Sequence, residues 1–339
     1  MQSDWQTFLG AQAASYTDGI VSDFGDAAAE LSATARSTVL CDLTQFGTLR
    51  VSGEDAQSFL QNLLSNDIRE VNAAQSQYSS FNTAKGRMLA TMLVYRQGSD
   101  YLLQLPASLT ELMRKKLSMY VLRAKAKITN ISNELILLGL SGSGAERALS
   151  LAGLAIPELA MGTTQNPAGS VIRIDQTRFE ISAPPEQATS LWQTFGQLAT
   201  PAGSPCWDWL NIRAGLPVIL PQTQEQFVAQ MANLDLTGGL NFKKGCYPGQ
   251  EIVARMHYLG KLKRRMYLAH LDKPAAPGDE LYSTAAQSCG MIVNATPSPA
   301  GGYDVLAVIQ TEIRDTQTVH LGSTDGAQLK FEALPYPLP

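Results

Sequence analysis

The chain has 339 residues, 45% of them hydrophobic, and a formal net charge of −4. This length suggests two or three domains, and the mildly acidic balance argues against a protein built mainly to hold nucleic acid. No apolar run approaches the roughly 20 residues that a membrane span needs, and the polar N-terminus does not resemble a signal peptide.

The cysteines and histidines exclude two further classes of protein. Four cysteines stand far apart, at positions 41, 206, 246 and 289, without a Cys-x-x-Cys pair. This spacing argues against a disulfide framework and favours a reducing compartment. The three histidines show no zinc-ligand spacing relative to the cysteines. We therefore expect a cytoplasmic protein with no resident metal.

The sequence pattern of the N-terminal part of the chain predicts alternating strands and helices. Strands are expected at 38–43 and 48–51, with Phe46 in the turn between them, followed by a helix whose apolar residues recur at helical spacing. Three further strands, at 78–82, 87–95 and 101–105, precede a helix for which Ser108 is the expected N-cap. Arg123, Lys125 and Lys127 then alternate, which predicts one cationic strand face, either solvated or facing an anion.

The middle and the end of the chain predict two more units. Segments 135–140, 144–152, 171–174, 179–182 and 185–198 give a β-α-β-β-α order, which is most of a ferredoxin-like unit. Pro201 to Pro205 is interpreted as a linker, and Trp207 and Trp209 lie in the helix that follows. Five short strands between 264 and 321, separated by glycine and proline turns, indicate a small β-barrel.

The most informative stretch is Lys243 to Glu251. Pro248 suits the first turn of a helix, and the segment 252–258 predicts that helix. Cys246 would then lie beside a helix start, with Lys243 and Lys244 nearby, a setting that favours the thiolate. A buried and inert cysteine is the alternative.

Residues 244–251, Lys-Gly-Cys-Tyr-Pro-Gly-Gln-Glu, resemble the signature of the YgfZ family of folate-binding proteins, which is related to the aminomethyltransferase (T-protein) of the glycine cleavage system. The resemblance extends along most of the chain and is strongest from about 211 to 265. It implies that Cys246 is a functional thiol, within a catalytic or functional motif formed with Lys244, Gly245, Tyr247, Gly249, Gln250 and Glu251.

The resemblance also implies an α+β, three-domain, T-protein-like ring with a ferredoxin-like middle unit and a C-terminal β-barrel. Its domains would be a discontinuous folate-binding domain at 1–130 and 201–259, a ferredoxin-like domain at 131–200 and a barrel domain at 260–339. The implied cofactor is tetrahydrofolate or a derivative, held between Phe46 and Trp207. Arg213 stands where the family often has a glutamate, and an arginine cannot accept hydrogen bonds from a pterin edge.

The resemblance implies an accessory protein for assembly or repair of iron–sulfur clusters, which supports tRNA modification indirectly. Its partners would be iron–sulfur proteins such as tRNA-methylthiolating enzymes, without stable direct binding of nucleic acid or membrane. An alternative is a folate-dependent aminomethyl or methyl transferase, but Met88 to Met92 lacks the aspartate that T-proteins carry there. A thiol redox or scaffold protein that works without folate is the other alternative.

Overall fold

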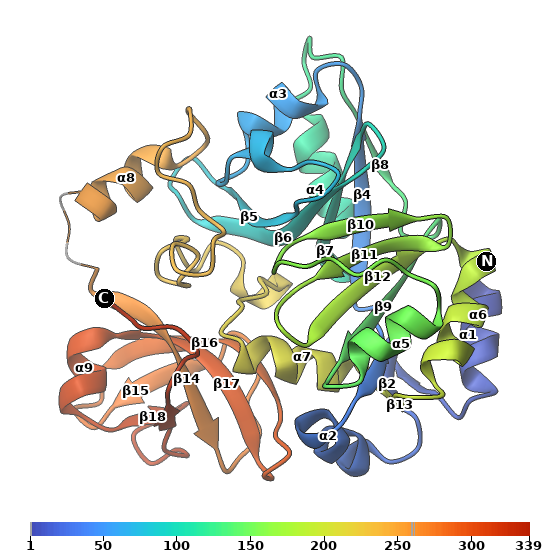
Figure 1. Cartoon of the computed structure of the whole chain (residues 1–339). Helices are drawn as coiled ribbons and strands as arrows, with labels where there is room; N and C mark the ends of the chain where they lie inside the picture. The colour runs from blue at the N-terminus through green and yellow to red at the C-terminus, as the bar shows by residue number, and fades with distance from the viewer. Residues whose placement is uncertain (1, 259, 261) are drawn as a thin grey trace. The chain divides into compact units, whose positions relative to one another are not determined.

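The computed structural model describes residues 2–258, 260 and 262–339, which Figure 1 traces. The chain forms two compact units, each assembled from segments far apart in sequence. The first contains residues up to 57, 69–77 and 93–207, and the second contains 58–68, 78–92 and 208–339. The expected three-domain division stays a prediction, and one of its boundaries, at 259, lies outside the described residues.

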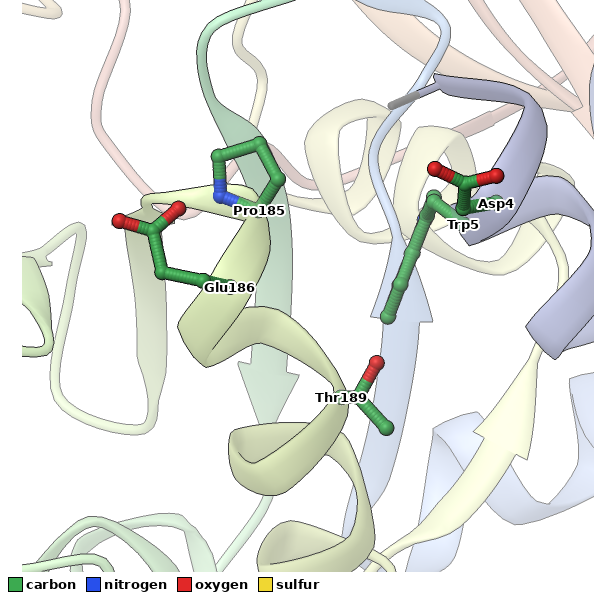
Figure 2. Close-up of a pocket in the computed structure, with 5 residues that line it drawn as sticks. All are labelled: Asp4, Trp5, Pro185, Glu186 and Thr189. Atoms are coloured by element: carbon green, nitrogen blue, oxygen red, sulfur yellow. The ribbon is translucent and has the colours of Figure 1, made fainter.

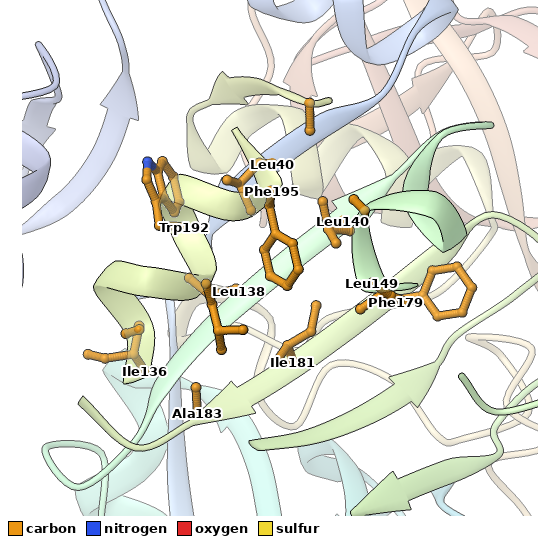
Figure 3. Close-up of a cluster of buried hydrophobic side chains, with 14 of the residues drawn as sticks. Leu40, Ile136, Leu138, Leu140, Leu149, Phe179, Ile181, Ala183, Trp192 and Phe195 are labelled. Carbon is orange, nitrogen blue, oxygen red and sulfur yellow. The ribbon is translucent and has the colours of Figure 1, made fainter. Parts of the chain in front are cut away.

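The first unit is built on a six-stranded sheet. Its strands follow the order β10 (Thr163–Asn166), β11 (Gly169–Arg173), β12 (Arg178–Ala183), β9 (Ile136–Ser141), β3 (Val39–Asp42) and β13 (Thr200–Ala202). On one face, α5 (Ala145–Leu151), α6 (Pro185–Phe195) and α1 (Gln2–Gly10) contribute to a shared apolar core. Figure 3 shows Trp192 and Phe195 of α6 among Leu138, Leu140 and Ile181 of the strands. The five predicted elements are present, but a further strand that was not predicted, β10, lies between α5 and β11.

One expectation near this sheet was wrong. The segment from Pro201 is not simply a linker, because Thr200–Ala202 forms β13, which pairs in parallel with β3. Proline is tolerated on such an edge strand, where its missing N–H leaves no ladder bond unmade. The helix α7 (Ser204–Arg213) follows at once. The N-terminal region also forms a hairpin, β1 (Ser15–Thr17) with β2 (Ile20–Asp23), and a helix, α2 (Ala27–Arg36).

A second sheet has the order β5 (Gln77–Asn82), β6 (Met88–Gln97), β7 (Asp100–Pro106), β4 (Phe46–Ser52) and β8 (Lys127–Asn130). Phe46 therefore begins a strand rather than occupying a turn. The helix α4 (Ala107–Ser118) begins directly after Pro106 and has no side-chain cap, so Ser108 is not its N-cap. Of the three alternating cations, only Lys127 lies in a strand. The short helices α3 (Ala56–Gln61) and η1 (Ile68–Glu70) complete this part of the chain.

The second unit contains a curled antiparallel sheet, a half-barrel, in the part of the chain where the β-barrel was expected. Its strands follow the order β18 (Val319–Leu321), β15 (Glu280–Ser283), β16 (Ser288–Pro297), β17 (Tyr303–Gln310), β14 (Arg264–Leu271) and β19 (Lys330–Glu332). Alternate residues enter two cores: Met266 and Leu268 on one face, Tyr267 and Ala269 on the other. The helix α9 (Thr311–Thr316) packs against β17, and α8 (Gln250–Tyr258) and η2 (Pro221–Thr223) belong to the same unit.

In the part of the chain that the structure describes, no helix is both long and apolar enough to cross a membrane.

Candidate functional site around Cys246

The signature segment leads into α8, as expected, with the helix beginning at Gln250. Gly249 has a φ of +81°, a conformation that favours glycine. A Cβ at this position would lie 2.3 Å from the Cα of Gly86 and 2.7 Å from the carbonyl oxygen of Thr83. Gly249 therefore lets the signature pack directly on the turn between β5 and β6.

Lys244 anchors the other end of the signature. Its side chain is only 4% exposed. The Nζ donates hydrogen bonds to the main-chain carbonyls of Gln61, at 2.6 Å, and of Leu64. It also lies 4.9 Å from the ring centre of Tyr247. Because cations complement the carbonyl end of a helix, this ammonium caps the end of α3. These two hydrogen bonds give Lys244 a structural role.

Tyr247 lies in the core, whereas the first residues of α8 lie at or near the surface. Tyr247 is buried in the apolar core that also contains Val253 and Met266, and burial raises the pKa of its hydroxyl. The side chain of Gln250 makes only a long contact, 3.5 Å, with the carbonyl of Lys244. Glu251 is exposed in the first turn of the helix, where a carboxylate is favourable.

The tip of the loop is open. Cys246 is exposed, whereas Cys41, Cys206 and Cys289 are buried. Apart from its two chain neighbours, no heavy atom of the described residues lies within 4 Å of the place that a Cβ on Gly245 would take. Lys243 is exposed beside them, and its N–H donates to Asn241 at 2.8 Å. The signature thus presents one accessible thiol on a loop that is fixed at both ends.

A stacked pair next to the signature was not foreseen. The rings of Phe242 and His257 lie 3.8 Å apart with an interplanar angle of 17°. The contact ties the segment before the signature to the last turn of α8, and so closes the loop around Cys246. Phe242 stands directly before the two lysines, but its pairing with a residue in the next helix has no signal in the local sequence.

The residues expected to hold folate lie in the first unit. Trp207 is completely buried, and its six-membered ring occupies the space where a Cβ on Gly139 would lie, within 2.6 Å. Its indole Nε1 has no hydrogen-bond partner among the described residues. Phe46 is half-buried at the start of β4. Their role as folate contacts stays a prediction.

One cavity of about 270 Å³ lies elsewhere in the first unit, between α1 and the start of α6 (Figure 2). Asp4, Trp5, Pro185, Glu186 and Thr189 line it. None of the expected site residues contributes to it, so we assign it no part in the candidate site. Among the described residues, no cluster of histidine, cysteine or acidic side chains could hold a metal ion.

A family model described as the GCVT N-terminal domain matches residues 7–241, which is more than half of the chain. The chain belongs to this family. The chain is also similar to the tRNA-modifying protein YgfZ of Klebsiella pneumoniae (strain 342), with 28% identity over 306 residues, covering 88% of this chain and 93% of the relative. The protein of the same name from Colwellia psychrerythraea (strain 34H / ATCC BAA-681) is 27% identical over 309 residues, covering 89% and 94%. The predicted resemblance is confirmed.

A similarity in structure covers almost the whole chain. The crystal structure of glycine cleavage system aminomethyltransferase T from Bartonella henselae matches with a TM-score of 0.82 and 18% identity, covering 99% of this chain and 97% of that protein. At this identity the match establishes the fold alone. The expected α+β fold of the T-protein type is therefore confirmed.

Arg213 stands where a glutamate was expected, and the structure of this GCVT-family chain shows what the arginine contacts instead. Its guanidinium pairs with Glu332 and lies 3.6 Å from Asp304. Asp304 is buried. It accepts a hydrogen bond from Trp209 Nε1 at 2.8 Å, and its other carboxylate oxygen lies 2.8 Å from His270 Nδ1. Arg213 is thus engaged in an ion-pair cluster of the second unit, and it offers no acceptor to a pterin.

A buried carboxyl lies near Trp207. Glu180 is 6% exposed, and burial raises its pKa to about 7. Gln104 Nε2 donates to it at 2.5 Å, and this bond, the charge of Arg178 and the indole of Trp207 oppose the rise. The Trp207 N–H does not reach the geometry of a full hydrogen bond. The first unit of this chain therefore encloses a carboxyl whose pKa is raised by burial.

We expect Glu180→Gln to remove a pH-dependent loss of stability. The pKa of Glu180 is about 7 in the folded state, raised from 4.5. Its contribution to the free energy of unfolding is therefore complete below pH 4.5 and is lost as the pH rises through 7. The variant should therefore gain about 2–3 kcal/mol relative to the natural protein between pH 5 and pH 8. Urea unfolding at several pH values measures this difference. The exposed Glu186→Gln is the control, and parallel curves for the natural protein and Glu180→Gln would contradict the assignment.

Proposed function

We propose that this protein acts through the Cys246 thiol as an accessory factor for the assembly or repair of iron–sulfur clusters in the cytoplasm. The main support for this proposal is that the signature exposes this thiol while the other three cysteines are buried. Cysteine thiolates are the usual ligands of iron–sulfur clusters. One thiolate cannot hold a cluster, so the remaining ligands would come from a partner protein.

The relatives are named tRNA-modifying proteins, and we propose that the effect of this chain on tRNA passes through such partners. Iron–sulfur enzymes that methylthiolate tRNA are the proposed clients. The bracing of the loop supports this role. Lys244 and Gly249 fix its ends, and the open side of Gly245 leaves room for another protein to approach the sulfur.

We further propose that a reduced folate is the cofactor, because the fold is that of an aminomethyltransferase, a folate-using enzyme. The residues present fit this ligand only in part. Phe46 offers a half-buried aromatic ring, but the Trp207 side chain is enclosed against Gly139. A folate site with an aromatic ring on each side would require Trp207 to leave its packing against Gly139. We therefore assign folate no step in the action of the thiol.

Titration with tetrahydrofolate at low and moderate salt tests this part of the proposal. Phe46→Ala should weaken binding several-fold, because stacking on one aromatic ring contributes about 0.5–1.5 kcal/mol beyond area burial. Phe24→Ala removes another half-buried phenylalanine of the same unit and should leave affinity unchanged. Trp207→Ala is unsuitable, because deletion of a buried tryptophan costs about 3–5 kcal/mol of stability. Equal affinities of the Phe46→Ala variant and the natural protein would reject Phe46 as a contact.

A further inference from the structure

Charge is distributed unevenly along the chain. Residues 107–130 contain six cationic side chains and one acidic side chain, a formal charge of +5, so the rest of the chain carries −9. The cations are Arg114, Lys115, Lys116, Arg123, Lys125 and Lys127. The overall charge of −4 therefore conceals a basic segment that spans α4, the turn after it and the start of β8.

The same segment exposes apolar side chains. Four of the eight exposed large hydrophobic residues among the described part of the chain lie here. Met119 is 68% exposed and Leu122 is 90% exposed, and Leu112 and Tyr120 accompany them. Clustered apolar exposure of this kind marks a site of interaction rather than an ordinary surface.

The turn that carries these residues is held rigidly. The N–H of Lys125 donates to Asp55 Oδ2 at 2.7 Å, and the N–H of Asp55 donates to the Lys125 carbonyl at 3.2 Å. A Cβ on Gly53 would lie 2.1 Å from that carbonyl oxygen. Leu122 has a φ of +41°, which is strained for a leucine. Such strain persists where the surroundings impose it, and it is often found at functional positions.

Part of the positive charge is not neutralised within the protein. Lys125 pairs with Glu54 at 2.7 Å, and Arg114 pairs with Glu111 at 2.7 Å. Arg123 and Lys127 are exposed and form no ion pair within the described residues. Lys115 is also exposed at the end of α4. A partner that covers this surface must therefore supply negative charge.

We propose that this surface, the α4–β8 patch (Lys115, Met119, Tyr120, Leu122, Arg123 and Lys127), binds a single-stranded or loop segment of RNA. Cations at both ends of the patch would contact phosphates, whose neutralisation supplies most of such affinity. Tyr120 and its apolar neighbours would contact unpaired bases, which stack on aromatic side chains. Three exposed cations of this short segment, Lys115, Arg123 and Lys127, suit a ligand with a charge at every nucleotide better than a protein surface with a few carboxylates. The proposal replaces the expectation drawn from net charge alone, and it does not depend on folate or Cys246.

Fluorescence anisotropy of the full chain with a labelled RNA of about 15 nucleotides tests the patch, with bulk tRNA as competitor. The test variant is Lys115→Gln/Arg123→Gln/Lys127→Gln. The matched control, Lys85→Gln/Arg147→Gln/Lys273→Gln, removes three exposed cations elsewhere. Circular dichroism verifies that both variants fold, as expected for changes at exposed side chains.

The patch variant should bind RNA about tenfold or more weakly at about 50 mM salt, and its salt slope should fall by about 2, whereas the control should stay within about twofold of the natural protein. Tyr120→Ser should weaken binding several-fold without changing the slope. The proposal is overturned if the natural protein does not bind RNA, or if both triple variants lose affinity equally. It is also overturned if polyglutamate competes as well as RNA, since the patch would then recognise an acidic protein.

Discussion

Gly249→Ala should destabilise the second unit strongly, whereas Gly245→Ala should be almost neutral. The left-handed φ of +81° at Gly249 costs an alanine about 1–2 kcal/mol. The added methyl group would also lie 2.3 Å from the Cα of Gly86, so the backbone of one segment must move. We expect a total loss of about 3 kcal/mol or more in the free energy of unfolding.

The comparison of these two glycines separates structure from function in the signature. Gly245 has open space around its Cα and no left-handed φ, so nothing in the fold requires a glycine there. Urea unfolding of both variants gives the difference directly. Equal stabilities would contradict the packing of the signature on the turn at Gly86. If Gly245→Ala folds normally but fails in cells, that glycine serves the approach of a partner.

Local patterns predicted those elements whose residues carry their own signal. Strands β14 and β15 and helix α8 are present close to where alternation and turn residues placed them. The strand at Thr200–Ala202 was missed because its formation depends on pairing with β3, far away in the sequence. Two prolines near it indicated a linker, and nothing local revealed the partner strand.

For two of the expected site residues, the sequence did not reveal the contacts that the structure gives them. Lys244 was expected to act as a cation near the thiol, but its Nζ is bonded to the carbonyls of Gln61 and Leu64. Trp207 was expected to form one wall of a cleft, and the absence of a side chain at Gly139 lets it become fully buried. Both outcomes depend on tertiary contacts, which a motif alone does not encode.

Cys246→Ser should abolish function and leave the fold intact. The side chain is exposed, so replacing sulfur with oxygen removes no core packing. A serine hydroxyl stays protonated at neutral pH and does not replace a thiolate as an iron ligand. We therefore expect unchanged unfolding curves and complete loss of activity in cells. Lys273→Gln, at an exposed position outside the signature, is the control and should retain activity.

The most direct measurement is the methylthiolated fraction of tRNA, determined by mass spectrometry, in cells that lack this protein and express either the natural chain or Cys246→Ser at equal level. Our account predicts that the natural chain and Lys273→Gln restore the modification and that Cys246→Ser leaves it at the level of the deletion. Full restoration by Cys246→Ser would contradict the central role of this thiol.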